Sequence, residues 1–182
     1  MALEFTTSYI EDAVAVFRHY KRLAERAMTQ VADEQLFAAI DREANSIGII
    51  VKHMAGNMRS RWTGFLTTDG EKPNRDRDRE FVDPPATREK LMAEWENGWD
   101  CVFKALEPLG DVDLGRTVTI RGEGHSVMQA VNRQLAHYSH HVGQIVLLAK
   151  HFAFDHWQSL SVPRNQSTDF NRKVAAGEVS QR

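Results

Sequence analysis

The sequence predicts an all-α fold, a four-helix bundle with long crossover connections. Four segments of roughly 20 residues repeat apolar side chains at the spacing of an α-helix. Two of the three connections between these segments are long, and internal repeats are absent. A chain of 182 residues with 42% hydrophobic content can bury one full core. We therefore expect a single bundle over residues 1–158 and an extended or partly disordered tail over residues 159–182.

The first helix is expected to begin near Thr7 or Ser8, either of which can cap it, and to end near Val31. His19 falls off its apolar stripe and should face the solvent. Leu36-Phe37 should lie in a connecting segment that covers one end of the bundle. The stripe itself consists of Ile10, Val14, Phe17, Ala24, Ala27, Met28 and Val31.

The second helix is expected over about residues 43–66, before an Asp69-Gly70 turn. The stretch 69–85, called the charged loop below, is long for a connection, so it should be either functional or disordered. Basic and acidic residues alternate over 75–80 and nearly cancel. We favour a solvated, self-paired loop that shapes one rim of a pocket. In the alternative, its arginines fold over an open metal position and receive an anionic group of the substrate or cofactor.

The third helix should begin after Pro85, with Thr87 as its cap, and should stop at Pro108. Cys101 lies off its apolar stripe and has no metal-ligand partner nearby in the sequence, so we interpret it as an inert small residue. A single cysteine excludes an intramolecular disulfide and is typical of a reducing compartment.

The last helix is the best defined by its sequence. Residues 117–121 alternate and are β-branched, which indicates a short strand or extended crossover before it. Ser126 and Gln129 have the spacing of a capping box, so the helix should begin there and continue to about Phe152.

Composition narrows the function classes. The formal net charge is −2 with acids and bases interspersed, so nucleic acid and anionic membranes are not expected as partners. The N-terminal residues lack the pattern of a signal peptide, and no apolar run approaches the ~18 residues that a membrane span requires. We expect a soluble, cytoplasmic protein that acts on a small molecule and can form a homodimer.

Three histidines occupy one turn of the last helix. His137 and His141 are four residues apart, so they lie one above the other and can direct their ring nitrogens at one ion. His141 falls inside the apolar arc and His137 at its edge, whereas His140 is turned toward the solvent. We therefore expect His137 and His141 to form a buried pair and His140 to lie on the surface.

A metal site of the zinc type needs at least three protein ligands, and the best third candidate is His53. His53 lies at the edge of the apolar arc of the second helix, with Asn57 on the same side. Each histidine could instead be satisfied by a hydrogen bond, but three at these positions favour a metal. Asn57 and Gln144 are candidates for orienting a ligand or substrate, or for filling a polar gap between helices. Tyr138 lies within the apolar arc, which favours core packing over proton transfer.

Several motifs lie along the chain in a recognisable order. They are His53, Gly56-Asn57, Ser60-Arg61-Trp62, Asp69-Gly70-Glu71-Lys72-Pro73, Arg77-Asp78-Arg79-Glu80-Phe81 and His137-x-x-x-His141-Val142-Gly143-Gln144-Ile145. Together they resemble the DinB/YfiT-like superfamily of metal-binding four-helix bundles, and more narrowly a bacterial branch known only as a domain of unknown function. The resemblance covers most of the chain and implies a divalent ion, commonly zinc or nickel, held by His53, His137 and His141. Characterised relatives include bacillithiol S-transferases and mycothiol-dependent isomerases, which implies that a low-molecular-weight thiol could take part.

Two function classes follow. Three neutral imidazoles would leave a divalent ion its full charge, which makes a thiol or a water molecule nucleophilic near neutral pH. The first class is therefore a metal-dependent enzyme acting on a small molecule, with thiol S-transfer as the leading version and hydrolysis as the other. The second is a non-catalytic, stress-related metal-binding protein in which the ion is structural. An open coordination position reached by a pocket would distinguish the first class from the second.

Overall fold

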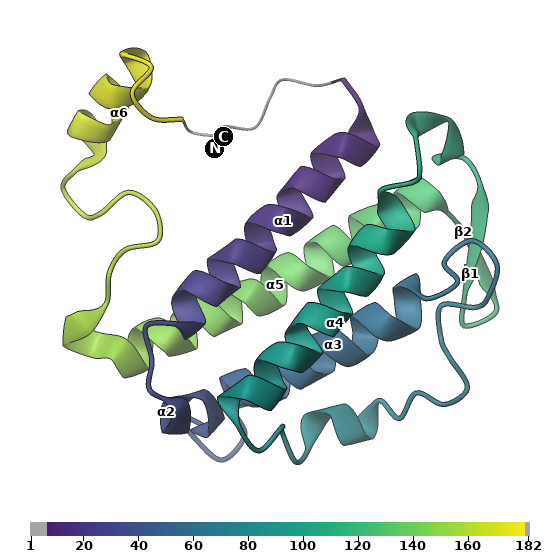
Figure 1. Ribbon diagram of the computed structural model, residues 1–182, viewed down its shortest axis with the longest axis horizontal. Coiled ribbons are helices and arrows are strands. Elements are labelled where there is room, and N and C mark those ends of the chain that lie inside the picture. The colour runs from purple at the N-terminus through teal and green to yellow at the C-terminus, as the bar shows by residue number, and fades with distance from the viewer. Residues whose placement is uncertain (1–6, 181–182) are drawn as a thin grey trace.

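The computed structural model describes residues 7–180, and four of its helices form a bundle (Figure 1). They are α1 (Tyr9–Met28), α3 (Ile47–Trp62), α4 (Arg88–Leu106) and α5 (Val127–Ala153). The predicted fold class is confirmed. A serine or threonine side chain accepts a backbone N–H bond at the start of each helix, which satisfies a donor that the helix itself cannot. These caps are Ser8, Ser46, Thr87 and Ser126.

The helices α1 and α5 run in one direction and α3 and α4 in the other (Figure 1). The Arg88 guanidinium, at the start of α4, donates to the carbonyls of Met28 and Val31 at the end of α1. After the other end of α4, Asp111 accepts from the backbone N–H of Ile10 at 3.1 Å. Because α3 and α4 are parallel, residues 63–87 must return along the whole bundle. That segment is a crossover, whereas the connection from α4 to α5 turns back at one end.

Large aromatic side chains fill the centre of the bundle, where α3 packs most extensively against α4 and α1 against α5. Phe17, Trp99 and Tyr138 are fully buried, and their ring centroids lie 5.6–6.1 Å apart in tilted or edge-on pairs. Gly98 allows α3 to come close, because a Cβ atom there would lie 3.0 Å from the Cα of Ala55. The packing of the core therefore fixes the positions of α3 and α5 relative to each other.

Small elements lie in the connections, including a short helix, α2 (Asp33–Phe37), where we expected only a connecting segment. The strand expected near 117–121 is β1 (Thr117–Ile120), and it pairs antiparallel with β2 (Glu123–Ser126). The second strand was not predicted, because Glu-Gly-His-Ser lacks the pattern of a strand. Residues 7–180 also contain three 3₁₀ turns: η1 (Asp78–Phe81), η2 (Asp111–Asp113) and η3 (Phe154–His156).

Other expected boundaries need correction. The first helix ends at Met28 rather than Val31, and α3 begins at Ile47 and ends at Trp62 rather than spanning 43–66. The expectation of an extended tail is wrong over α6 (Ser167–Ala175), which is helical and lies away from the bundle in Figure 1. Among residues 7–180, no helix combines the length and apolar character needed to cross a bilayer.

Candidate metal centre

Three histidine side chains converge where α3 and α5 face each other. The Nε2 atom of His137 lies 3.3 Å from Nε2 of His53 and 3.2 Å from Nε2 of His141. The nitrogens of all three residues that could bind an ion lie within 4.8 Å of one another. His53 is buried, whereas His137 and His141 are half-buried rather than fully buried as expected. His19 and His140 are exposed, as predicted.

These separations fit a small divalent ion. Nitrogen ligands 2.0–2.1 Å from a tetrahedral zinc ion lie about 3.3–3.4 Å from one another. Both measured separations are within a few tenths of an ångström of this value. Without a cation, two ring nitrogens this close must share one proton between their lone pairs. The arrangement is therefore suited to a cation bound by three nitrogens.

The outward nitrogen of His53 is fixed by a carboxylate from the charged loop. His53 Nδ1 lies 2.9 Å from Glu80 Oε2, and a carboxylate can only accept, so Nδ1 carries the proton and Nε2 keeps its lone pair. Arg75 pairs with the same carboxylate through Nε at 2.8 Å and Nη2 at 2.9 Å. Burial would raise the pKa of Glu80, but the hydrogen bonds from His53 and Arg75 outweigh it and lower this pKa. Glu80 is therefore ionised and orients His53.

The other two histidines differ in how their outward nitrogens are held. His141 Nδ1 lies 2.8 Å from the amide oxygen of Gln144, three residues later on α5, so this nitrogen also carries the proton. The buried Nδ1 of His137 has no hydrogen-bond partner among the described residues. His53 and His141 are thus the two histidines whose Nε2 lone pairs are fixed by a neighbour.

Both α5 histidines are neutral at physiological pH, as metal ligands must be. The pKa of His137 is lowered to about 3, first by burial and then by the nearby His141 and His53. Burial also lowers the pKa of His141 to about 4, although the hydrogen bond to Gln144 opposes the shift.

The charged loop is self-paired, as we favoured from the sequence, because Arg75 forms ion pairs with Glu71 and Glu80. It is not solvated at these residues, however. Glu80 is 6% exposed, and only 5% of the Arg75 side chain is accessible. The aromatic ring of Phe81 stacks on the His53 ring with centroids 4.6 Å apart. A glycine makes room for this packing: a Cβ at Gly56 would lie 2.3 Å from Glu80 Oε1. The loop therefore covers the outer face of α3.

Asn57 does not hydrogen-bond to any of the three histidines. Its side-chain oxygen accepts from the Tyr138 hydroxyl at 3.0 Å, and that hydroxyl accepts from Trp62 Nε1 at 3.0 Å. Burial raises the pKa of Tyr138, so it stays protonated and acts as a core residue, as expected. Cys101 is partly buried, and its sulfur lies 3.9 Å from the Thr63 hydroxyl, away from the histidines.

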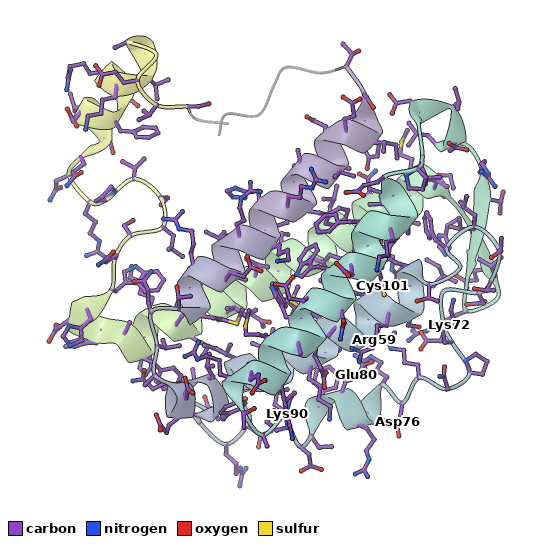
Figure 2. The ribbon with its side chains drawn as sticks, viewed as in Figure 1. Arg59, Lys72, Asp76, Glu80, Lys90 and Cys101 are labelled. Carbon is purple, nitrogen blue, oxygen red and sulfur yellow. The ribbon has the colours of Figure 1, made fainter. Side chains whose placement is uncertain are left out.

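Two pockets adjoin the centre. One, of about 170 Å³, is lined by both His53 and His137 together with Asn57 and several arginines. The other, of about 440 Å³, lies outside Glu80 and includes none of the histidines. Figure 2 labels Glu80, Arg59, Lys72 and Asp76, which all line this second pocket. Of these two pockets, the smaller is therefore the one that reaches the histidines.

Residues 4–166 match the family model described as "Protein of unknown function (DUF1572)". The chain belongs to this family. The match includes all three histidines of the centre and the whole charged loop. No curated protein matches the chain significantly. The description of the family assigns no reaction to the histidine cluster.

Sequence reasoning missed Glu80 and Arg75 as members of the centre. Both lie in a loop whose alternating charges look self-compensating. Glu80 contacts His53, which is 27 residues away in the sequence, and Arg75 reaches the centre only through Glu80. One available signal was Gly56 on α3, because a glycine inside a helix often marks the close approach of another segment.

Proposed function

We propose that this protein is a metal-dependent enzyme that acts on a small molecule, with thiol S-transfer as its leading reaction. The ligands are His53, His137 and His141, and the ion is zinc or nickel. One observation carries the proposal: three Nε2 atoms converge, neighbours hold two of the rings from behind, and a pocket opens at the same place. The resemblance to the DinB/YfiT-like superfamily supports the choice of thiol transfer.

When bound, a divalent ion lowers the pKa of a thiol or water molecule that reaches it and stabilises the developing negative charge. The chain supplies the rest of the centre. Three neutral imidazoles leave the ion its positive charge, and Glu80 and Gln144 keep two of those rings in a fixed orientation. Phe81 and the buried part of the charged loop exclude water behind His53. The smaller pocket receives the substrate beside His53 and His137.

A purely structural ion is the competing interpretation. Structural zinc sites are closed by four protein ligands, whereas catalytic sites have three and an open position. Within residues 7–180, the group of possible ligands consists of the three histidines. This count and the adjoining pocket favour catalysis over a structural role.

The ligand assignment is tested by elemental analysis of protein purified without added metal. We expect His53→Ala, His137→Ala and His141→Ala each to lose most of the bound ion, because each removes one of three ligands. His140→Ala and His19→Ala are matched controls on exposed positions and should keep it. Near-stoichiometric metal in His141→Ala would contradict the assignment.

The reaction is tested separately with the metal-loaded protein. Bacillithiol and other small thiols are offered with a bimane-type electrophile, and conjugation is compared for metal-loaded, chelated and His137→Ala protein. Conjugation by the metal-loaded form alone supports thiol transfer. If no thiol is conjugated but ester or amide substrates are cleaved in a metal-dependent way, hydrolysis replaces thiol transfer as the proposed reaction. If neither conjugation nor cleavage is detected while the metal stays bound, the result supports a structural role for the ion.

A further inference from the structure

The pocket beside the histidines is unusually rich in arginine. Five guanidinium groups come from four separate parts of the chain: α3, the charged loop, the hairpin turn and α5. Chains that gather like charges into one cavity usually place an opposite charge there, because the groups otherwise repel one another. These residues are Arg61, Arg75, Arg77, Arg121 and Arg133.

Two carboxylates balance only part of this charge. Glu71 pairs with three of the arginines at 3.0–3.4 Å, and Glu80 pairs with Arg75 at 2.8 Å. These two carboxylates pair with only three of the five arginines, and no acidic residue is among those that line the pocket. Arg77 and Arg133 form no ion pair with the carboxylates of residues 7–180, and both are exposed to the pocket.

Arg77 and Arg133 line the pocket from two different elements, the charged loop and α5. The Arg77 guanidinium carbon lies 5.2 Å from the centroid of the Phe81 ring, which itself stacks on His53. Arg133 precedes His137 by four residues on α5, so the two share one face of that helix. A group held by both arginines would therefore lie directly beside the converging nitrogens.

Unpartnered polar atoms gather at the same pocket. Within residues 7–180, four buried side-chain nitrogens or oxygens have no hydrogen-bond partner, and three belong to residues that line it. They are Arg61 Nε, Gln134 Oε1 and His137 Nδ1; Arg61 is 6% exposed and Gln134 3% exposed. Buried polar groups usually have partners. Arg61 Nε–H is a donor that lacks an acceptor, which an oxyanion supplies, whereas the Gln134 oxygen is itself an acceptor and does not bind one.

We propose that the pocket binds an oxyanion, a phosphate or carboxylate group, that forms part of the substrate. Guanidinium groups bind both groups through paired N–H donors, and a cavity of about 170 Å³ has room for one such group with a few atoms attached. Arg77 and Arg133 provide the free positive charges, and Arg61 and Gln134 line the inner wall. The statement that the anion is part of a substrate rests on the proposed function. Binding of the anion can be measured without any reaction.

The test measures binding of inorganic phosphate and of succinate to metal-free protein by calorimetry at constant ionic strength. Metal-free protein is used because both anions also bind divalent ions. We expect saturable binding that weakens about tenfold in Arg133→Gln and in Arg77→Gln, because each loses one charge-assisted contact. The tighter of the two anions identifies the chemical class of the substrate group.

Arg22→Gln is the matched control, since Arg22 is also an exposed helical arginine but lies on α1 away from the pocket. It should bind the anions as the unmodified protein does. Equal weakening in Arg22→Gln, or no saturable binding of either anion at tens of millimolar, would overturn the proposal. Elemental analysis of Arg133→Gln should show unchanged metal content. If the unmodified protein binds the anion but holds no metal, the proposed reaction fails while the anion pocket stands.

Discussion

The charged loop (69–85) and the C-terminal segment (157–180) are both polar connections outside the bundle, yet their side chains lie in very different surroundings. The loop buries Glu80 and most of Arg75 against α3. No residue of the described C-terminal segment is buried. Its ion pairs lie within α6, where Asp169 contacts Arg172 and Lys173 on exposed side chains.

The difference shows what allows a charged segment to enter a protein interior. A buried charge needs a partner and hydrogen bonds, and the two buried charges Arg75 and Glu80 have them: Arg75 pairs with Glu80, and Glu80 with His53. The helix must also leave space, which Gly56 does. The C-terminal segment has neither a buried partner nor a gap facing it. We therefore expect the loop, but not the C-terminal segment, to control the metal centre.

Glu80→Ala should have the largest effect. It leaves Arg75 buried without its closest carboxylate and releases His53 Nδ1, so we expect about 3–5 kcal/mol less stability, as for other broken buried pairs. Metal affinity should fall about 10–100-fold, because the support of a ligand is lost. Urea unfolding of metal-free protein and competitive metal titration measure the two effects.

Asp169→Ala removes a carboxylate from an exposed pair on α6 and is the control. It should change stability by less than about 1 kcal/mol and leave metal affinity unchanged. Glu80→Gln keeps the shape of the side chain, so this variant should fold even if Glu80→Ala does not. Its metal binding should still be weakened. Equal behaviour of Glu80→Gln and Asp169→Ala would mean that the loop is not part of the centre.

Gly56→Ala should have an intermediate effect. The new Cβ would lie 2.3 Å from Glu80 Oε1, so the loop must move and the bond from His53 to Glu80 should break. Overpacking of this kind costs about 1–3 kcal/mol, which exceeds the roughly 1 kcal/mol that alanine gains over glycine in a helix. Metal titration and thermal unfolding provide the measurements.

Gly143→Ala is the matched control, because it is also a helical glycine close to the centre, yet nothing lies within 4 Å of its Cβ position. This variant should be slightly stabilised and should bind metal normally. A stabilised Gly56→Ala with unchanged metal affinity would show that the loop yields freely at this position.

Local patterns predicted most of the bundle. Two features depend on residues within four positions of each other. One is the capping box of Ser126 and Gln129, in which both hydrogen bonds are present, and the other is the pairing of His137 with His141. His53 was predicted because the edge of a helical face can be read from spacing alone. Glu80 could not be predicted in the same way, since its contact with His53 requires a loop to return across α3. Helix α6 was missed because its residues have no buried face from which to recognise it.

Acid should destabilise the metal-free protein through the centre. In the unfolded chain a histidine has a pKa near 6.5, whereas His137 and His141 have values lowered to about 3 and about 4. Between these limits the unfolded state binds more protons than the native state, so stability falls as the pH decreases below about 6.5. Urea unfolding at several pH values should show a shallower fall in His137→Gln. An identical profile in that variant would contradict these shifts. Residues 164–182 contain no histidine, so their removal should leave the histidine-dependent part of this fall unchanged.

Deletion of residues 164–182 should have the smallest effect. The deletion keeps Trp157 and Leu160, which pack against the core, and the mutual hydrogen bonds of Gln30 and Gln158. The part removed contributes no buried residue among those described, so the expected loss of stability is below about 0.5 kcal/mol. For a protein of this size that corresponds to a decrease in Tm of no more than about 2 °C. Metal content should match that of the full chain. A decrease in Tm beyond about 5 °C, or loss of metal, would show that α6 supports the bundle and would remove the contrast between the two segments.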